Sequence, residues 1–435
     1  MLIEVSVGEA IDKYSILELK VKKITDPVKN NEILKELDAL KETCFFIKKY
    51  EFFYSLLLYI NEKIWNLTDE IKQIKPSNVF FATLSNQIFE YNQKRFRLKN
   101  FFNILCDSSI KEQKSYSTQC CKVYIQNEEI LLDKIAELNY LTIEYDFVYL
   151  DTQVSQEYIK NIFQAPTIIF TNEIDTQNQV KIDLNEYMIE PSFHSIFEFK
   201  PITYIAGGKM GDFIQSLSVI NENFYNTGKK GCLYLSNKGD SFHDLNKAYH
   251  DTYDLITFQR YISSYQLVQN GMSCTINIDL TLWRNSPLLF NQNWCNIFSN
   301  FYSIPWGKHK WLTSLEHKQH KIDKNCILIS TTSYRFPVNL DYKSLIENFK
   351  SAGNLIFYMS QTVEFYDDFI NRTGLSKDEI ELCQPTSFAE MCNMIDSCKL
   401  FIGNLSAPLA IAFAYHKEHI TGFPGTLDDI HNKNL

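Results

Sequence analysis

The second half of the chain alternates short apolar segments with amphipathic ones, and this pattern restricts the possible folds more than any other feature. From residue 326 onward the apolar segments have the length of buried strands, and the stretches between them carry apolar residues at helical spacing. The apolar segments are CILISTT, LIFYMS, IELCQP, KLFIGN and HITGF. Strands that alternate with helices form a parallel sheet with helices on both faces. The stretch from 201 begins in the same way. We therefore predict an α/β fold with two Rossmann-like parallel-sheet domains, at 201–320 and 321–435, that face a cleft.

A glycine-rich turn, AGGKMGD, joins the first strand of this region to its first helix. The strand is ITYIA, and the helix that follows carries Phe213, Leu217, Ile220 and Phe224 on one face. Such a turn brings backbone N–H groups and the positive end of a helix to one place, where an anion binds well. The predicted loop at the cleft consists of Gly207, Gly208, Lys209, Met210 and Gly211.

Two side chains of this turn have alternative interpretations. Asp212 either caps the helix or acts on a reacting hydroxyl. Lys209 is either a surface lysine or a contact for phosphate or for an acidic acceptor. The turn alone does not decide between them.

Residues 1–116 form a separate, helix-rich block. We expect a short strand at 2–7, then a helix whose start has the capping-box spacing of Ser6 and Glu9. Pro27 ends that helix, and the apolar spacing after it predicts one long helix toward Trp65. A third helix is expected over 82–105. Three amphipathic helices make a bundle that packs on itself, dimerises or docks a partner.

Residues 117–200 are predicted to form an α/β adapter. Short strands and helices alternate as far as PTIIFTN (166–172), and the polar stretch 173–200 is expected to be a hairpin or loop.

The composition excludes several classes of protein. The formal net charge is −9 and no long basic run occurs, so a nucleic-acid-binding surface is not expected. The 11 cysteines are scattered and odd in number, which suits reduced thiols in a cytoplasm better than a disulfide framework. The start of the chain lacks the pattern of a signal peptide, and no 18-residue apolar window occurs. We expect a cytoplasmic protein without a transmembrane segment, for which peripheral attachment to the inner membrane stays open.

Two motifs in the second half resemble the bacterial heptosyltransferase family of GT-B glycosyltransferases. That family has a GxGD turn and, later, a segment of the form figNDSGPxHLAaAl; this chain has GKMGD at 208–212 and FIGNLSAPLAIAFA at 401–414. The order and distance of the two motifs also fit, and the resemblance covers 201–424. Separately, SVGEAIDKYSILELKVKKITDP with a trailing IKEQKSY is similar to a small uncharacterised helical domain found with bacterial sugar-transfer proteins, over 1–116.

The later motif departs from the family at three positions. Asn404, Ser406 and Pro408 match, whereas the family's Asp, Gly and His fall at Leu405, Ala407 and Ala410. The acidic residue that grips the donor's sugar is therefore absent. The donor then differs from ADP-heptose, or the site transfers no sugar.

The resemblance implies an inverting, metal-independent transfer of a sugar from a nucleotide-diphosphate sugar to a glycan hydroxyl, as in cell-surface polysaccharide synthesis. Such a reaction needs a base for the acceptor hydroxyl and positive character near the departing diphosphate. Asp212 is the candidate base. The candidate donor residues follow two predicted strands: Ser330, Thr331, Thr332, Arg335, Asn404, Ser406, Ala407 and Pro408. Their alternative role is that of ordinary loop and cap residues.

No cofactor besides the donor, and no metal, is expected. The histidines show no metal-ligand spacing, and the pairs Asp367–Asp368 and Asp428–Asp429 have the pattern of solvated surface. Trp306, His309 and Trp311 form either an acceptor-facing wall or a packed hinge.

Two other functions compete with sugar transfer. A non-catalytic nucleotide-sugar-binding or scaffold protein on a degenerate GT-B fold would explain the departures in the later motif. A nucleotide-sugar epimerase shares the fold, but the Asp-His-Glu set that its chemistry needs is not evident. The helical block would serve as a homodimer contact or would recruit the acceptor or a partner.

Overall fold

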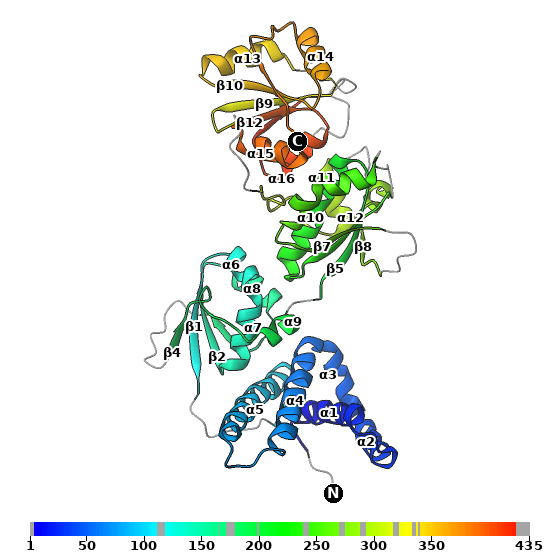
Figure 1. Ribbon diagram of the computed structural model, residues 1–435, viewed down its shortest axis with the longest axis vertical. Coiled ribbons are helices and arrows are strands. Elements are labelled where there is room, and N and C mark those ends of the chain that lie inside the picture. The colour runs from blue at the N-terminus through cyan, green and yellow to red at the C-terminus, as the bar shows by residue number, and fades with distance from the viewer. Residues whose placement is uncertain are drawn as a thin grey trace. The chain divides into compact units, whose positions relative to one another are not determined.

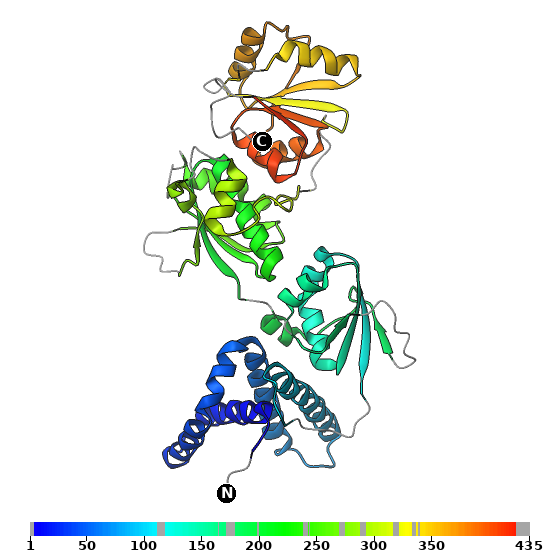
Figure 2. The same cartoon turned by 180° about the vertical axis from the view of Figure 1, so that it is seen from behind.

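The computed structural model describes residues 4–110, 118–163, 165–170, 179–197, 200–237, 242, 244–268, 275–287, 293–315, 322–332, 336–337 and 340–422. The chain divides into two compact units, Met1–Glu198 and Phe199–Leu435 (Figures 1 and 2). The finer boundaries expected near 116, 200 and 320 stay predictions. Among the helices in the described part of the chain, none is both long enough and apolar enough to cross a membrane.

The first unit begins with a set of helices. Their bounds are α1 Val7–Lys23, α2 Pro27–Ala39, η1 Lys41–Thr43, α3 Cys44–Lys49, α4 Glu51–Ile71 and α5 Val79–Leu105. The predicted cap is confirmed, because the Ser6 hydroxyl accepts a hydrogen bond from the Glu9 N–H at 3.1 Å. Asp26 caps α2, and Pro27 follows in its first turn, where its missing N–H costs nothing. The strand expected at 2–7 is wrong in its described part, since residues 4–6 are irregular and α1 begins at Val7.

The long helix expected after Pro27 is wrong, because the chain breaks at Leu40 and again at Tyr50. A straight helix from Pro27 to Trp65 would be about 58 Å long, whereas α1 measures about 25 Å. The apolar stripe of such a helix would extend beyond the end of α1, the helix that buries it. Instead the Thr43 hydroxyl donates to the Leu40 carbonyl at 2.7 Å and closes a turn. Both α2 and α4 then pack against α1.

A four-stranded parallel sheet follows the helices in the first unit. Its strands are β1 Cys120–Ile125, β2 Phe147–Thr152, β3 Ile168–Phe170 and β4 Gln179–Ile182, in the order β3-β2-β1-β4. Its helices are α6 Glu128–Asp133, α7 Ile135–Glu144, α8 Gln156–Ile162 and α9 Pro191–Phe197. The loop or hairpin expected at 173–200 is wrong in its described part. A polar edge strand carries little apolar signal, so its pairing with β1 was not visible in the sequence.

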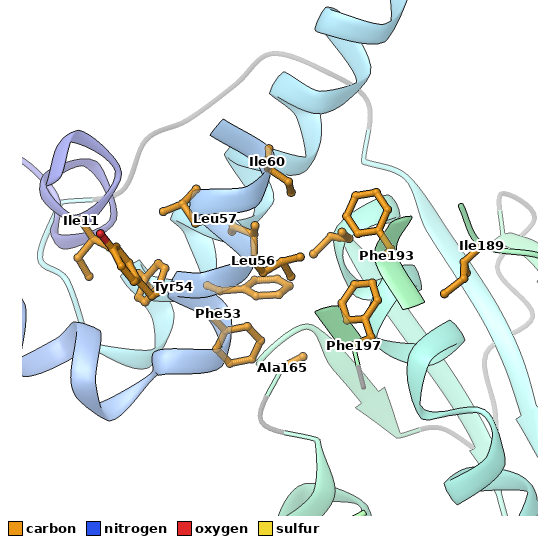
Figure 3. Close-up of a cluster of buried hydrophobic side chains, with 14 residues drawn as sticks. Ile11, Phe53, Tyr54, Leu56, Leu57, Ile60, Ala165, Ile189, Phe193 and Phe197 are labelled. Carbon is orange, nitrogen blue, oxygen red and sulfur yellow. The ribbon is translucent and has the colours of Figure 1, made fainter. Parts of the chain in front are cut away.

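One hydrophobic core joins the first helices to this α/β part (Figure 3). Phe193 and Phe197 on α9 face α4, where Phe53 and Leu56 lie. The Phe193 ring stacks on Phe197 at 5.8 Å and meets the Tyr140 ring edge-on at 5.0 Å. The adapter and the helical block therefore share their core.

The second unit opens with a sheet of four parallel strands. They are β5 Ile202–Ala206, β6 Gly231–Leu235, β7 Ile262–Leu267 and β8 Ile278–Asp279, in the order β7-β6-β5-β8. The accompanying elements are α10 Met210–Thr227, α11 Leu245–Thr257, η2 Leu282–Asn285 and α12 Trp294–Tyr302. The predicted strand is β5, the predicted helix is α10, and the glycine turn lies between them.

The second sheet of this unit has five parallel strands in the order β11-β10-β9-β12-β13. Its strands are β9 Cys326–Ser330, β10 Leu355–Met359, β11 Glu381–Cys383, β12 Leu400–Gly403 and β13 His419–Thr421. Its helices are α13 Tyr342–Ser351, α14 Val363–Thr373, α15 Phe388–Ser397 and α16 Ala407–Ala414. The alternation predicted from the sequence is confirmed, and with it the two Rossmann-like sheets and the helical N-terminal region. The cleft expected between the sheets stays a prediction.

Replacing Phe193 by alanine is expected to lower the free energy of unfolding of the first unit by about 3–5 kcal/mol, because its buried ring leaves a cavity in the shared core. Chemical denaturation followed by circular dichroism measures the loss. Phe45→Ala is the matched control, since that side chain is 69% exposed and should change the free energy by no more than about 0.5 kcal/mol. Equal effects of the two changes would contradict the core as described.

Candidate functional site

The strand order reverses once in each sheet of the second unit. In the first sheet the reversal lies between β5 and β8, and in the second between β9 and β12. Ligands of open parallel sheets bind outside the carboxyl ends of the strands at such reversals. The relevant loops are 207–209 and 280–287 in the first sheet, and 331–332 and 404–406 in the second.

The first reversal brings Asp212 to Arg284. Lys209 occupies the N-cap of α10, and Asp212 lies in the first turn, where the helix dipole favours a negative charge. Its carboxylate accepts a hydrogen bond from Arg284 Nη2, and the two side chains are 21% and 23% exposed. Arg284 belongs to η2, directly after β8, and its guanidinium lies over the Trp283 ring at 4.6 Å. The Asp212–Arg284 pair therefore connects the loop after β5 to the segment after β8.

Gly208 makes room for this pair. Its φ of +91° lies in the left-handed region, and a Cβ placed there would come within 2.9 Å of Arg284 Nη1. That same Nη1 is buried and has no hydrogen-bond partner among the residues that the structure describes. A buried donor without a partner lowers stability by about 1–3 kcal/mol, so a ligand atom that accepts a hydrogen bond from Nη1 would recover this free energy.

At the second reversal Asn404 ties the two loops together. Its buried side chain donates to the Thr332 hydroxyl at 2.9 Å and accepts from the Thr332 N–H at 3.3 Å. The Ser406 hydroxyl donates to the Asn404 carbonyl at 2.9 Å. The structure thus brings three of the candidate residues together, Thr332, Asn404 and Ser406, and the side chain of Asn404 holds the two loops in place.

Ser330 and Thr331 lie at the end of β9 and are both buried. The Thr331 hydroxyl is 3.0 Å from the Tyr358 hydroxyl, which also donates to the Thr331 carbonyl at 3.1 Å. Burial raises the pKa of Tyr358, so its phenol keeps its proton and remains a donor. Arg335, the predicted phosphate partner, lies outside the described residues.

The helices that follow the two reversals, α10 and α16, pack against each other. A Cβ on Gly211 would lie 3.5 Å from the Ala407 nitrogen and 3.6 Å from the Ser406 carbonyl carbon. Two helix N-termini, each equivalent to about half a positive charge, therefore meet at one place. Pro408 lies in the first turn of α16, where it leaves the other N–H groups free to face an anion.

The three departures from the heptosyltransferase motif lie at the start of α16. Leu405 is half-buried in the loop before the helix, Ala407 begins the helix beside Gly211, and Ala410 is buried inside it. None of these side chains carries a group that could hold a sugar hydroxyl. The acidic side chain that would hold the donor's sugar is therefore missing close to the contact between α10 and α16.

The segment 304–314 fastens α10 to the end of α16. Trp306 Nε1 donates to the Gln215 carbonyl at 3.0 Å, and Trp311 Nε1 donates to the Ile214 carbonyl at 2.8 Å. The backbone N–H of Trp311 reaches the Ala414 carbonyl at 3.1 Å. Of the two interpretations of these tryptophans, the structure supports the packed hinge.

His309 is held in the same segment by a carboxylate that solvent does not reach. Glu222 is 0% exposed; it accepts from the His309 N–H at 2.8 Å and lies 2.9 Å from His309 Nδ1. The Tyr225 ring stacks on the imidazole at 3.7 Å. Nearby, burial and the charge of Lys310 lower the pKa of His416. His309 thus serves the packing of the segment.

No family model and no curated protein matches the chain. Similar solved structures include the glycosyl transferase family 9 protein from Veillonella parvula, which is 11% identical with a TM-score of 0.35 over 52% of this chain and 85% of that one. Another is the E. coli heptosyltransferase WaaC with ADP, 9% identical with a TM-score of 0.31 over 51% and 86%. A third is the iron-containing dodecameric glycosyltransferase TibC from enterotoxigenic E. coli, 12% identical with a TM-score of 0.35 over 52% and 58%. At these values the likeness concerns the arrangement of the elements alone.

Sequence reasoning missed Arg284. It follows a strand of two residues, β8, that the sequence did not reveal, and its meeting with Asp212 depends on β8 pairing with β5. The available signal was an arginine directly after Trp283 in the largely apolar stretch LTLWRN.

Gly208→Ala and Gly353→Ala form a matched pair that tests the geometry at Arg284. Both glycines have a positive φ, but a Cβ on Gly353 would have no neighbour within 4 Å. Each change should lower the free energy of unfolding by about 1–2 kcal/mol. Only Gly208→Ala should displace Arg284 from Asp212 and increase the labelling of Arg284 by phenylglyoxal, as measured by mass spectrometry. Unchanged labelling in Gly208→Ala would contradict the contact.

Proposed function

We propose that the second unit is an inverting, metal-independent glycosyltransferase that uses a nucleotide-diphosphate sugar and glycosylates a hydroxyl of a glycan acceptor. The observation that carries this proposal is the meeting of two helix N-termini at Gly211 and Ala407, with the carboxylate of Asp212 in the first turn of one of them. An anion site and a base stand side by side there, and a transfer of this kind needs both. The enzyme would work in the cytoplasm.

The reaction is a displacement at the anomeric carbon. The acceptor oxygen forms the new bond, the bond to the diphosphate oxygen breaks, and the acceptor proton passes to Asp212. The nucleoside diphosphate leaves with the bonding electron pair. Its growing charge would be stabilised by the N–H groups at the starts of α10 and α16.

Arg284 would position the base in this scheme. Its Nη2 holds the Asp212 carboxylate, while the buried Nη1 has no partner among the described residues. A phosphate or an acceptor oxygen close to Asp212 would satisfy Nη1. The guanidinium would then orient the base and the substrate with one planar group.

On the donor side, the groups differ in their availability. The side chain of Asn404 is occupied by Thr332, and the Thr331 hydroxyl by Tyr358. The first N–H groups of α16, beginning with that of Ala407, would donate to phosphate oxygens, whereas Pro408 has no N–H to offer. Ser330, Ser406 and Arg335 remain candidates from the sequence; the Ser406 hydroxyl would have to turn from the Asn404 carbonyl, and Arg335 lies outside the described residues. Since Leu405, Ala407 and Ala410 carry no polar group, the sugar would be held by contacts other than those of the heptosyltransferases.

The alternative is a non-catalytic nucleotide-sugar-binding or scaffold protein on the same fold. The apolar side chains at Leu405, Ala407 and Ala410 favour it. Such a protein would bind a nucleotide but release no product.

Thermal unfolding with UDP, ADP, GDP, CMP and their sugars should reveal the donor. A nucleotide at 100 times its dissociation constant should stabilise the unit that binds it by about 2.7 kcal/mol. With the donor so identified, Asp212→Asn should keep this stabilisation and lower the rate of sugar transfer about 10²–10⁴-fold, because the base is lost.

Asp251→Asn on α11 is the control and should leave transfer unchanged, since its exposed carboxylate forms an ion pair with the exposed Lys247 on the same helix. Stabilisation by no nucleotide would overturn both the transferase and the nucleotide-binding alternative. Stabilisation without transfer to any glycan would favour the alternative.

EDTA tests the proposed independence of metal. Because helix N-termini and Arg284 would supply the positive character, an excess of EDTA should leave the transfer rate within about twofold. Within the described residues no group of three or more His, Cys, Asp or Glu side chains is placed to hold an ion. Loss of activity with EDTA and its return with Mg²⁺ or Mn²⁺ would contradict the metal-independent scheme.

A further inference from the structure

Among the residues that the structure describes, the sheet of the first unit has one buried face and one face whose side chains are partly exposed, called here the open face. Along β1 the side chains of Cys121, Val123 and Ile125 are buried, whereas Lys122 is half-buried and Tyr124 is 59% exposed. The strand β2 alternates in the same way. Sheets whose strands are all parallel are nearly always covered on both faces. By contrast, every residue of β9 in the second unit is buried.

The described helices explain why one face stays open. Figures 1 and 2 show α6, α7 and α8 on the same side of the sheet. The helix α9 packs against α7, and the core shared with α4 lies on this side too. Right-handed crossovers from β1 to β2 and from β2 to β3 place their helices on one face. Among the described helices, none covers the other.

The open face combines aromatic rings with charged groups. We define it by six side chains on β1, β2 and β4: Lys122, Tyr124, Phe147, Tyr149, Asp151 and Lys181. The strand register places Lys122 between Tyr149 and Lys181, and places Tyr124 beside Asp151. Lys122 pairs with Asp151 at 3.3 Å, and Phe147 is 36% exposed. Phe147 and Tyr149 thus lie along β2, and Tyr124 lies diagonally from Tyr149 on β1, with the charged groups beside these rings.

We propose that the open face binds a glycan chain. The C–H faces of sugar rings pack on exposed aromatic rings, while their hydroxyls donate to a carboxylate and accept from ammonium groups. Tyr124, Tyr149 and Phe147 supply the rings, and Asp151, Lys122 and Lys181 supply the polar partners. The proposal concerns a holding surface in the first unit and does not depend on the chemistry of the second.

Size and charge argue against a second copy of the chain on this face. With strands about 4.8 Å apart and about 3.3 Å per residue, four strands present roughly 20 Å by 17 Å, or about 350 Å². A stable interface needs about 800 Å² from each partner. Dry packing would also desolvate the Lys122–Asp151 pair. A glycan chain fits the area and keeps these groups hydrogen-bonded.

Binding of the labelled full-length protein to an array of bacterial lipopolysaccharides and capsular polysaccharides tests the proposal. We expect binding to at least one glycan, weakened about tenfold or more in Tyr124→Ala and retained in Tyr124→Trp, which keeps an aromatic ring. Tyr253→Ala is the matched control, since Tyr253 is 41% exposed on α11 of the second unit. Tyr124→Ala should leave transfer to a small soluble acceptor unchanged, so loss of transfer and loss of holding can be told apart.

Three outcomes would overturn the proposal. They are the absence of binding to every glycan on the array, equal binding by Tyr124→Ala with its melting temperature unchanged, and a dimer that Tyr124→Ala converts to a monomer in light scattering. The last would assign the open face to a second copy.

Discussion

The packing of α10 is the constraint on which the second unit depends. This helix is buried along most of its length, including Glu222 at 0% exposure. Its first turn meets α16, its carbonyl groups at Ile214 and Gln215 hold the two tryptophans of the connecting segment, and Glu222 holds His309. Because one rigid helix makes all these contacts, the position of Asp212 relative to the start of α16 is fixed by packing and not by its own loop. Because the residues of such a site are already ordered, binding a ligand costs little conformational entropy.

The fold could be predicted where the apolar pattern is local and strong. From Cys326 to Thr421 each strand is a short apolar run and the helices between them carry apolar faces, so the strands β9–β13 could be predicted from the sequence alone. Prediction failed where distant partners decide. The break of the long helix at Leu40 depends on the length of α1, and β4 depends on its pairing with β1. A polar edge strand and a bent helix leave little trace in a single sequence.

The candidate site divides along the same line. Asp212, Thr332, Asn404 and Ser406 are candidates from the sequence because they follow predicted strands, and the structure connects the last three by hydrogen bonds. Arg284 could not be found, since its position depends on a strand of two residues and on the strand order. For the two tryptophans the sequence left an acceptor-facing wall and a packed hinge open, and their indole N–H groups prove to hold α10.

Packing also helps to separate structural from functional residues. Asn404 matches the heptosyltransferase motif, yet its buried hydrogen bonds to Thr332 are reason enough for an asparagine at that position. Its presence therefore says more about the fold than about a donor. Asp212 and Arg284 are different: both are partly exposed, and a buried guanidinium nitrogen lacks a partner among the described residues. A fold optimised for stability alone would remove that cost of about 1–3 kcal/mol. An acceptor group of a bound ligand at this nitrogen would remove that cost, in a transferase and in a binding protein alike.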